Sequence, residues 1–248
     1  MLLIGGYTDK GQRRNRNEDA YAIVAGEAAC IVADGVGGNH AGEIASQTAV
    51  AIASEFMSVN RLSEKEQEQL PAFFDECLAK ANEDVIEIAA EFPENKGMAT
   101  TMVICHVRDD KAFFANVGDS RGYLCRDSEL IQITEDHSYV NALRQLGVLT
   151  EEQAKAHESG NVITRAIGAE SVVEADHFQV SVQKGDTLLL CTDGLYGEVS
   201  KEEIIFILET EDNPEEMCRR LIDAANKHGG RDNITAVAIR YMGGPDHE

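Results

Sequence analysis

The sequence lacks tryptophan, has only four prolines, and contains half as many basic residues as acidic ones. Its 22 lysines and arginines stand against 44 aspartates and glutamates, which gives a formal net charge of −22 at pH 7. Proteins bind a phosphate backbone through clustered lysine and arginine, and here no run of these residues is longer than a pair. The charge therefore argues against nucleic acid as a partner, and against an anionic membrane surface.

Long apolar stretches and cysteine motifs are missing as well. The apolar N-terminus ends at Gly5, too early for a signal peptide, and no stretch approaches the roughly 18 apolar residues of a transmembrane helix. The six cysteines include no C-x-x-C pair and lie mostly in apolar runs, which favours buried reduced thiols over disulfides or zinc. We therefore expect a cytoplasmic protein with no membrane attachment.

The sequence does contain enough apolar material for a large core. Hydrophobic residues occupy 43% of its 248 positions, and neither a repeat nor a Pro/Gly/Ser-rich linker divides the chain. We therefore treat residues 1–248 as a single domain.

Short β-rich runs are interspersed with amphipathic segments. Strands are predicted at residues 21–24, 29–33, 101–107, 112–117, 122–125, 178–182, 187–191 and 234–241. Helices are predicted at residues 41–57, 71–92, 138–146, 151–157, 201–208 and 214–227, and the charged residues 63–69 are expected to form a solvated loop. Because strands and helices do not alternate regularly, the order favours an α+β fold with largely antiparallel sheets covered by helices.

Carboxylates recur at the ends of these strands. Five segments far apart in the chain carry them, namely those with Asp34, Asp193, Asp119, Asp232 and the pair Glu18 and Asp19. In two of these segments a glycine follows the aspartate directly, which permits a tight turn and a close backbone approach. Any single Asp-Gly pair is typical of a surface turn. The repeated pattern instead predicts a shared site for a hard divalent ion, Mg²⁺ or Mn²⁺.

The glycine-rich stretch after Asp34 fits neither of two common nucleotide-binding motifs. A dinucleotide fingerprint beginning at Gly35 needs glycine where His40 stands, and a P-loop beginning at Gly37 needs lysine where Glu43 stands. We therefore expect these glycines to serve the turn and the start of the following helix.

Eight motifs in this chain resemble, in order, those of the metal-dependent protein phosphatases of the 2C type. They lie at residues 9–19 (DKGQRRNRNED), 32–38 (VADGVGG), 97–101 (GMATT), 116–121 (NVGDSR), 134–138 (TEDHS), 164–168 (TRAIG), 192–195 (TDGL) and 231–235 (RDNIT). The short chain is similar to the bacterial members that oppose Ser/Thr protein kinases. The resemblance implies an α+β fold, a β-sandwich of two mainly antiparallel sheets flanked by helices on both sides, with a flap over about residues 138–168.

The resemblance also implies a binuclear Mn²⁺ or Mg²⁺ centre at one end of the sandwich. By position, Asp34 would bridge both ions, the Gly35 carbonyl would bind the second, and Asp193 and Asp232 would complete the first. A water shared by the two ions would attack the phosphorus of phosphoserine or phosphothreonine, in line with the departing oxygen. The implied partners are phosphorylated proteins, including a Ser/Thr protein kinase and its substrates, and the enzyme is expected to act as a monomer.

Further roles are implied for four other residues. Glu18 and Asp19 would act through metal-bound water, and Asp119 together with Asp193 would hold a third, more weakly bound ion. Arg14 would grip the substrate phosphate, since a guanidinium can pair two phosphate oxygens at once.

The chain departs from the family pattern in two places. Animal members carry histidine directly after Asp-Gly, where this chain has Val36, so no general acid is assigned. Bacterial members tend to have histidine where Asn39 stands, and His40 follows it here. In the flap, Gly147 and Gly160 are plausible hinges, and substrate choice is expected to reside there.

Two other functions fit parts of the pattern. A metal-dependent phosphodiesterase or nuclease would keep the ions, but the negative charge and the missing basic track weigh against it. A phosphoprotein-binding module without hydrolysis would be supported by the loss of a metal-binding aspartate, yet Asp34, Asp193 and Asp232 are all in place.

Overall fold

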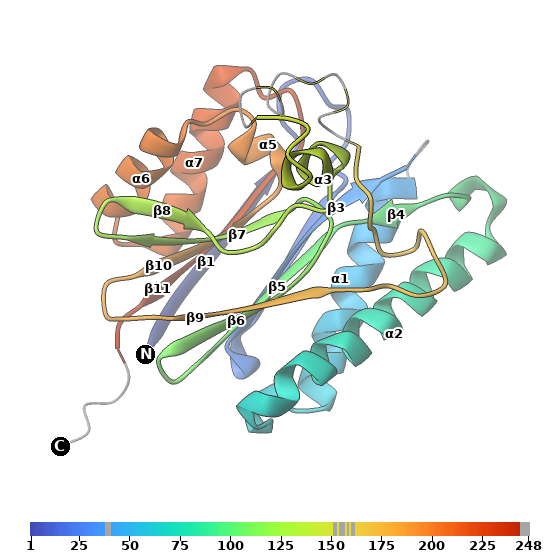
Figure 1. Ribbon diagram of the computed structural model, residues 1–248, viewed down its shortest axis with the longest axis horizontal. Coiled ribbons are helices and arrows are strands. Elements are labelled where there is room, and N and C mark those ends of the chain that lie inside the picture. The colour runs from blue at the N-terminus through green and yellow to red at the C-terminus, as the bar shows by residue number, and fades with distance from the viewer. Residues whose placement is uncertain (38–40, 151–152, 154–156, 158, 160–161, 244–248) are drawn as a thin grey trace.

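Two antiparallel sheets stack face to face, and helices cover both outer faces, in the computed structural model of the chain (Figure 1). The structure describes residues 1–37, 41–150, 153, 157, 159 and 162–243. Within these residues, no helix is long and apolar enough to cross a membrane. The expected α+β sandwich is confirmed.

The first sheet has the order β1-β11-β10-β7-β8, and the second has the order β2-β3-β5-β6-β9 with β4 beside β3. The strands of the first sheet are β1 (Leu2–Asp9), β7 (Arg121–Arg126), β8 (Glu129–Gln132), β10 (Thr187–Cys191) and β11 (Ile234–Tyr241). Those of the second are β2 (Asp19–Val24), β3 (Ala29–Val36), β4 (Ala99–Thr100), β5 (Met102–Arg108), β6 (Lys111–Val117) and β9 (Asp176–Ser181).

The helices fall into two outer layers and a few short turns. Helices α1 (Ala41–Val59) and α2 (Leu70–Glu91) cover the second sheet, and α6 (Lys201–Thr210) and α7 (Pro214–His228) cover the first (Figure 1). The shorter helices are α3 (Tyr139–Gln145), α5 (Asp193–Tyr196), η1 (Ala25–Glu27), η2 (Leu62–Glu64), η3 (Gln67–Gln69) and η4 (Pro93–Asn95).

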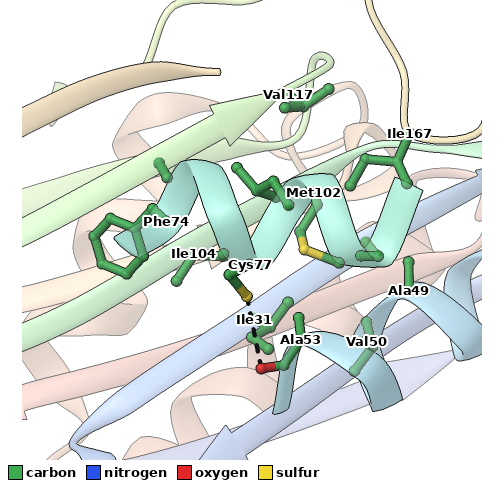
Figure 2. Close-up of a cluster of buried hydrophobic side chains, with 14 of the residues drawn as sticks. Ile31, Ala49, Val50, Ala53, Phe74, Cys77, Met102, Ile104, Val117 and Ile167 are labelled. Atoms are coloured by element: carbon green, nitrogen blue, oxygen red, sulfur yellow. Dashed lines mark hydrogen bonds between the residues drawn. The ribbon is translucent and has the colours of Figure 1, made fainter. Parts of the chain in front are cut away.

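Strand β3 shows why the central strands are continuously apolar. Ile31 packs in the cluster beneath α1 and α2, whereas Cys30 and Val32 pack in the cluster between the two sheets. Both faces of the strand are therefore buried, and successive side chains serve different cores. Figure 2 shows the outer core, where the Cys77 thiol on α2 donates a 3.7 Å hydrogen bond to the Ala53 carbonyl on α1.

Most predicted elements are found within a few residues of their expected ends. Strands β1, β4 and β8 and the one-turn helix α5 were not predicted, and residues 63–69 contain the short helices η2 and η3 where a plain loop was expected. The predicted helix at 151–157 lies largely outside the described residues. The expectation of buried reduced thiols is confirmed, because all six cysteines are free and buried.

Candidate metal centre and active site

The segments that carry the predicted carboxylates come together at the end of the sandwich near α3 and α5 (Figure 1), where Asp34 feels the charges of Asp19, Asp119, Asp193 and Asp232. Antiparallel pairing of β2 with β3 sets Asp19 directly opposite Asp34. In the first sheet, β10 runs into Asp193 at the start of α5, and its antiparallel neighbour β11 begins just after Asp232. Asp119 lies in the short connection between β6 and β7. Two sheets and a connection between them therefore supply one cluster.

The acidic side chains of this cluster raise one another's pKa. Burial, together with the charges of Asp19, Asp193, Asp119 and Asp232, raises the pKa of Asp34 well above its ordinary value. Burial is also the main cause that raises the pKa of Asp19 to about 7 and that of Asp193 to about 6, with neighbouring aspartates adding to both. Protein burial disfavours a carboxylate, and nearby like charges disfavour it further. The site is therefore short of positive charge.

Close backbone approaches explain both Asp-Gly pairs. A Cβ at Gly35 would lie 2.0 Å from the Gly42 carbonyl oxygen at the start of α1, and one at Gly194 would lie 2.0 Å from the Asn233 carbonyl oxygen. Any side chain at either position would force these segments apart. The expected tight turn is correct at Gly194, where α5 begins, but wrong at Gly35, because β3 continues to Val36 and pairs there with β4.

Buried threonines hold the aspartates in place. The hydroxyls of Thr192 and Thr235 donate to Oδ2 of Asp19 at 2.8 and 2.7 Å. The Asp34 amide donates to the Thr101 hydroxyl at 2.9 Å, and the Thr100 hydroxyl donates to the Asp34 carbonyl at 2.9 Å. Sequence reasoning gave these threonines no role, although each lies in one of the eight motifs and could have been noticed there.

Two carboxylate oxygens in the cluster are buried without a hydrogen-bond donor, Oδ1 of Asp19 and Oδ1 of Asp193. A buried acceptor without a partner is costly, and a hard divalent cation together with its bound waters would satisfy both. Among the described residues, no group of three or more His, Cys, Asp or Glu side chains is already placed as the ligands of one ion. The polar groups of the cluster are carboxylates, and oxygen is the donor that Mn²⁺ and Mg²⁺ take.

Asp119 is more tightly fixed than a turn residue requires. Its side chain is buried, and burial, with the charges of Asp193 and Asp136, raises its pKa to about 7. The Tyr196 hydroxyl donates to the Asp119 carbonyl at 3.1 Å. The preceding Gly118 amide donates to Nδ1 of His137 at 3.1 Å. These contacts fix the backbone on both sides of the Asp119 side chain, which lies within electrostatic reach of Asp193.

Arg14 is the cation at the edge of the cluster. Its Nη2 donates to Oδ2 of Asp232 at 2.7 Å, and 49% of its side chain remains exposed. Glu18 lies nearby, and burial raises its pKa although the Arg14 charge acts in the opposite direction. The Asn233 side chain connects the segment after Asp232 with the segment of Glu18, because its Oδ1 accepts from the Glu18 amide at 2.8 Å. An anion that approaches the cluster would meet the free edge of the Arg14 guanidinium.

The flap region is described only in part. Ser138 caps the N-terminus of helix α3, where its hydroxyl accepts from the Asn141 amide, and Gly147 adopts a φ of 70°. Gly147 thus lies in the left-handed region, which glycine adopts without strain, and its role as a hinge stays a prediction. The expected hinge Gly160 and the residues Asn39 and His40 lie outside the described residues.

All eight predicted site residues belong to this one end of the sandwich.

The chain matches the family model of protein phosphatase 2C over residues 9–236. It is 37% identical to the serine/threonine phosphatase stp of Listeria monocytogenes serovar 1/2a, over 94% of this chain and 93% of that protein.

Solved structures give the same result. The serine/threonine phosphatase of S. agalactiae superposes with a TM-score of 0.88 at 34% identity, covering 97% of this chain and 99% of that one. The catalytic domain of the serine/threonine protein phosphatase PstP, in complex with 2 manganese ions, superposes with a TM-score of 0.83 at 33% identity, covering 97% and 99%. The chain belongs to the protein phosphatase 2C family.

Proposed function

We propose that this chain, a protein serine/threonine phosphatase, hydrolyses phosphoserine and phosphothreonine monoesters with two divalent ions, Mn²⁺ or Mg²⁺, held by its carboxylate cluster. The observation that carries the proposal is the pair of buried, unpartnered carboxylate oxygens of Asp19 and Asp193 among acids that raise one another's pKa. The manganese ions of the PstP complex support it.

The residues that would hold the ions are those that the family resemblance implies. Asp34, the Gly35 carbonyl, Asp193 and Asp232 would be direct ligands. Glu18 and Asp19 would act through water, and Asp119 would help Asp193 to hold a third, weaker ion. Bound there, the ions would supply Lewis acidity and would lower the pKa of a water enough for it to attack phosphorus near neutral pH.

The protein's own groups position the substrate and favour the charged form of Asp19. The exposed edge of the Arg14 guanidinium pairs with the phosphate oxygens, while its bond to Asp232 keeps the side chain at the mouth of the site. Thr192 and Thr235 stabilise the charged form of Asp19. No thiol competes as a nucleophile, because all six cysteines are buried and burial raises the pKa of Cys30, Cys77 and Cys218 to about 12.

The proposed substrates are phosphorylated proteins, and the enzyme would oppose a Ser/Thr protein kinase in the cytoplasm. Its action as a monomer is part of the same proposal. The net charge of −22 supports the absence of nucleic acid among its partners.

One assay tests the reaction class. Protein freed of metal by chelation is given an aryl phosphate, a phosphothreonine peptide and a phosphodiester, each with and without Mn²⁺. We expect Mn²⁺-dependent hydrolysis of the two monoesters. Preferential cleavage of the diester would replace this function with a phosphodiesterase. Binding of the phosphopeptide without turnover would replace it with a phosphoprotein-binding module.

A further inference from the structure

A groove of about 500 Å³ lies beside the carboxylate cluster. One side of the groove contains Val36 and Ala99, which pair across β3 and β4, and the rest of its lining comes from residues 163–166, 169–170 and 172–174. Val36 is only two residues beyond Asp34 in the same strand. The volume falls in the range of roughly 300–1,000 Å³ that is usual for a binding site. The groove therefore reaches a residue two positions from the central aspartate, which is close enough for a substrate bound at the cluster to contact it.

Direct hydrogen bonds attach the groove to the site. Thr100 and Ile167 exchange two backbone hydrogen bonds, at 2.9 and 2.8 Å, which fixes the return of the flap segment against β4. The hydroxyl of the same Thr100 donates to the Asp34 carbonyl at 2.9 Å. The wall of the groove and the central aspartate are thus joined through one residue. A peptide held in the groove would be held at a fixed position relative to Asp34.

The lining of the groove combines exposed aliphatic surface with uncompensated negative charge. Val36 and Val172 are 36% and 72% exposed. Glu170 and Glu174 are exposed, and within the described part of the chain neither forms an ion pair. The groove's one arginine, Arg165, is already paired with Asp176 at 2.8 Å. The lining therefore complements a segment that carries an aliphatic side chain and a positive charge.

We propose that this groove binds the substrate segment next to the phosphorylated residue, and that it selects segments with a lysine or arginine and an aliphatic side chain. The inference rests on the proposed phosphatase function and adds to it a preference among phosphoproteins. A small aryl phosphate fills the phosphate site alone, so it reports the chemistry without the groove.

The test compares kcat/KM on matched phosphothreonine peptides with kcat/KM on an aryl phosphate, in the presence of Mn²⁺. One peptide series scans a single arginine along both sides of the phosphothreonine, and a second scans a glutamate. We expect arginine to be favoured on one side of the phosphothreonine, and the preference to weaken at high salt. The groove proposal would be overturned, and the phosphatase function left intact, if wild type hydrolysed the aryl phosphate but showed the same kcat/KM on the arginine and glutamate series.

The charge of the groove is tested by Glu170→Lys combined with Glu174→Lys. For this double variant, kcat/KM on the favoured arginine peptide, divided by kcat/KM on the aryl phosphate, should fall about tenfold. A change of this size is expected for two reversed charges at an exposed site. The matched control is Glu68→Lys with Glu202→Lys, two exposed glutamates outside the groove that should leave the ratio unchanged. An equal fall in both double variants would show a general charge effect and would overturn the proposal.

The aliphatic preference has its own matched pair. Val172 in the groove and Val59 at the end of α1 are 72% and 70% exposed. Phosphothreonine peptides with and without an aliphatic flanking residue are compared, and wild type should prefer the former; Val172→Asp should abolish this preference, whereas Val59→Asp should keep it. If Val172→Asp kept the preference, the proposal that Val172 contacts the aliphatic side chain of the substrate would be wrong.

Discussion

Removal of metal should make the stability of this protein fall as pH rises, and Asp119 provides the sharpest case. Burial raises the pKa of Asp119 to about 7, whereas an unfolded aspartate titrates near 3.9. Between these two values the folded protein binds more protons than the unfolded chain does. The unfolding free energy contributed by such a group is therefore fully present at low pH and is lost as pH rises toward 7.

The size of the effect follows from the shift. A pKa raised by about three units corresponds to about 4 kcal/mol in total, of which about 3 kcal/mol lies between about pH 5 and about pH 8. For a chain of this length, a change of about 3 kcal/mol moves the melting temperature by roughly 6 to 12 °C. Mn²⁺ takes the place of the protons, so its stabilising effect should be larger at the higher pH.

The assay is thermal unfolding of chelator-treated protein at the two pH values, with and without Mn²⁺, for wild type and Asp119→Asn. Burial lowers the pKa values of His106 and His137, and these groups contribute with the opposite sign. Comparison with the variant cancels them. We expect the fall in melting temperature between about pH 5 and about pH 8 to be smaller in Asp119→Asn. An identical fall in both proteins, or equal stabilisation by Mn²⁺ at both pH values, would refute the reasoning.

Three further substitutions test individual roles. Asp193→Asn should abolish turnover, while the melting curve of the metal-free protein keeps its cooperative shape. If the variant kept more than about a tenth of the wild-type kcat, which is a barrier change under roughly 1.4 kcal/mol, Asp193 would not belong to the metal centre. Arg14→Ala should raise KM strongly for phosphomonoesters, and an unchanged KM would make Arg14 a surface charge. Asp119→Ala should keep two tightly bound ions and lose the third in calorimetric Mn²⁺ titration, with lower turnover; identical stoichiometry and turnover would leave Asp119 as a turn residue.

The predictable part of the fold was the part with two buried faces. Strands such as β3 and β10 are continuously apolar because their neighbouring side chains enter different cores, and each delivers an aspartate to the same end of the sandwich. The sequence pattern was therefore sufficient to collect the acids. It also predicted the close approaches at Gly35 and Gly194, though not the continuation of β3 past Gly35.

The elements that were missed depend on partners distant in sequence. Glycines interrupt the apolar pattern of β1, whose eight residues pair along the whole of β11. Strand β8 is an edge strand with Leu130 as its one buried residue. Its sequence therefore lacks the alternation of apolar and polar residues that predicts a strand. The groove forms between Val36 and a later segment of the chain, which the Thr100–Ile167 bridge holds beside β4. No local pattern contains such contacts.

The central claim is that the carboxylate cluster holds two divalent ions bridged by Asp34. Crystals soaked in Mn²⁺ and measured at the manganese absorption edge test it most directly. We expect two anomalous peaks roughly 3.5 to 4 Å apart, both in contact with the Asp34 carboxylate, with Asp193 and Asp232 on one ion and the Gly35 carbonyl on the other. Manganese bound elsewhere, with no peak within coordination distance of Asp34, would contradict the claim.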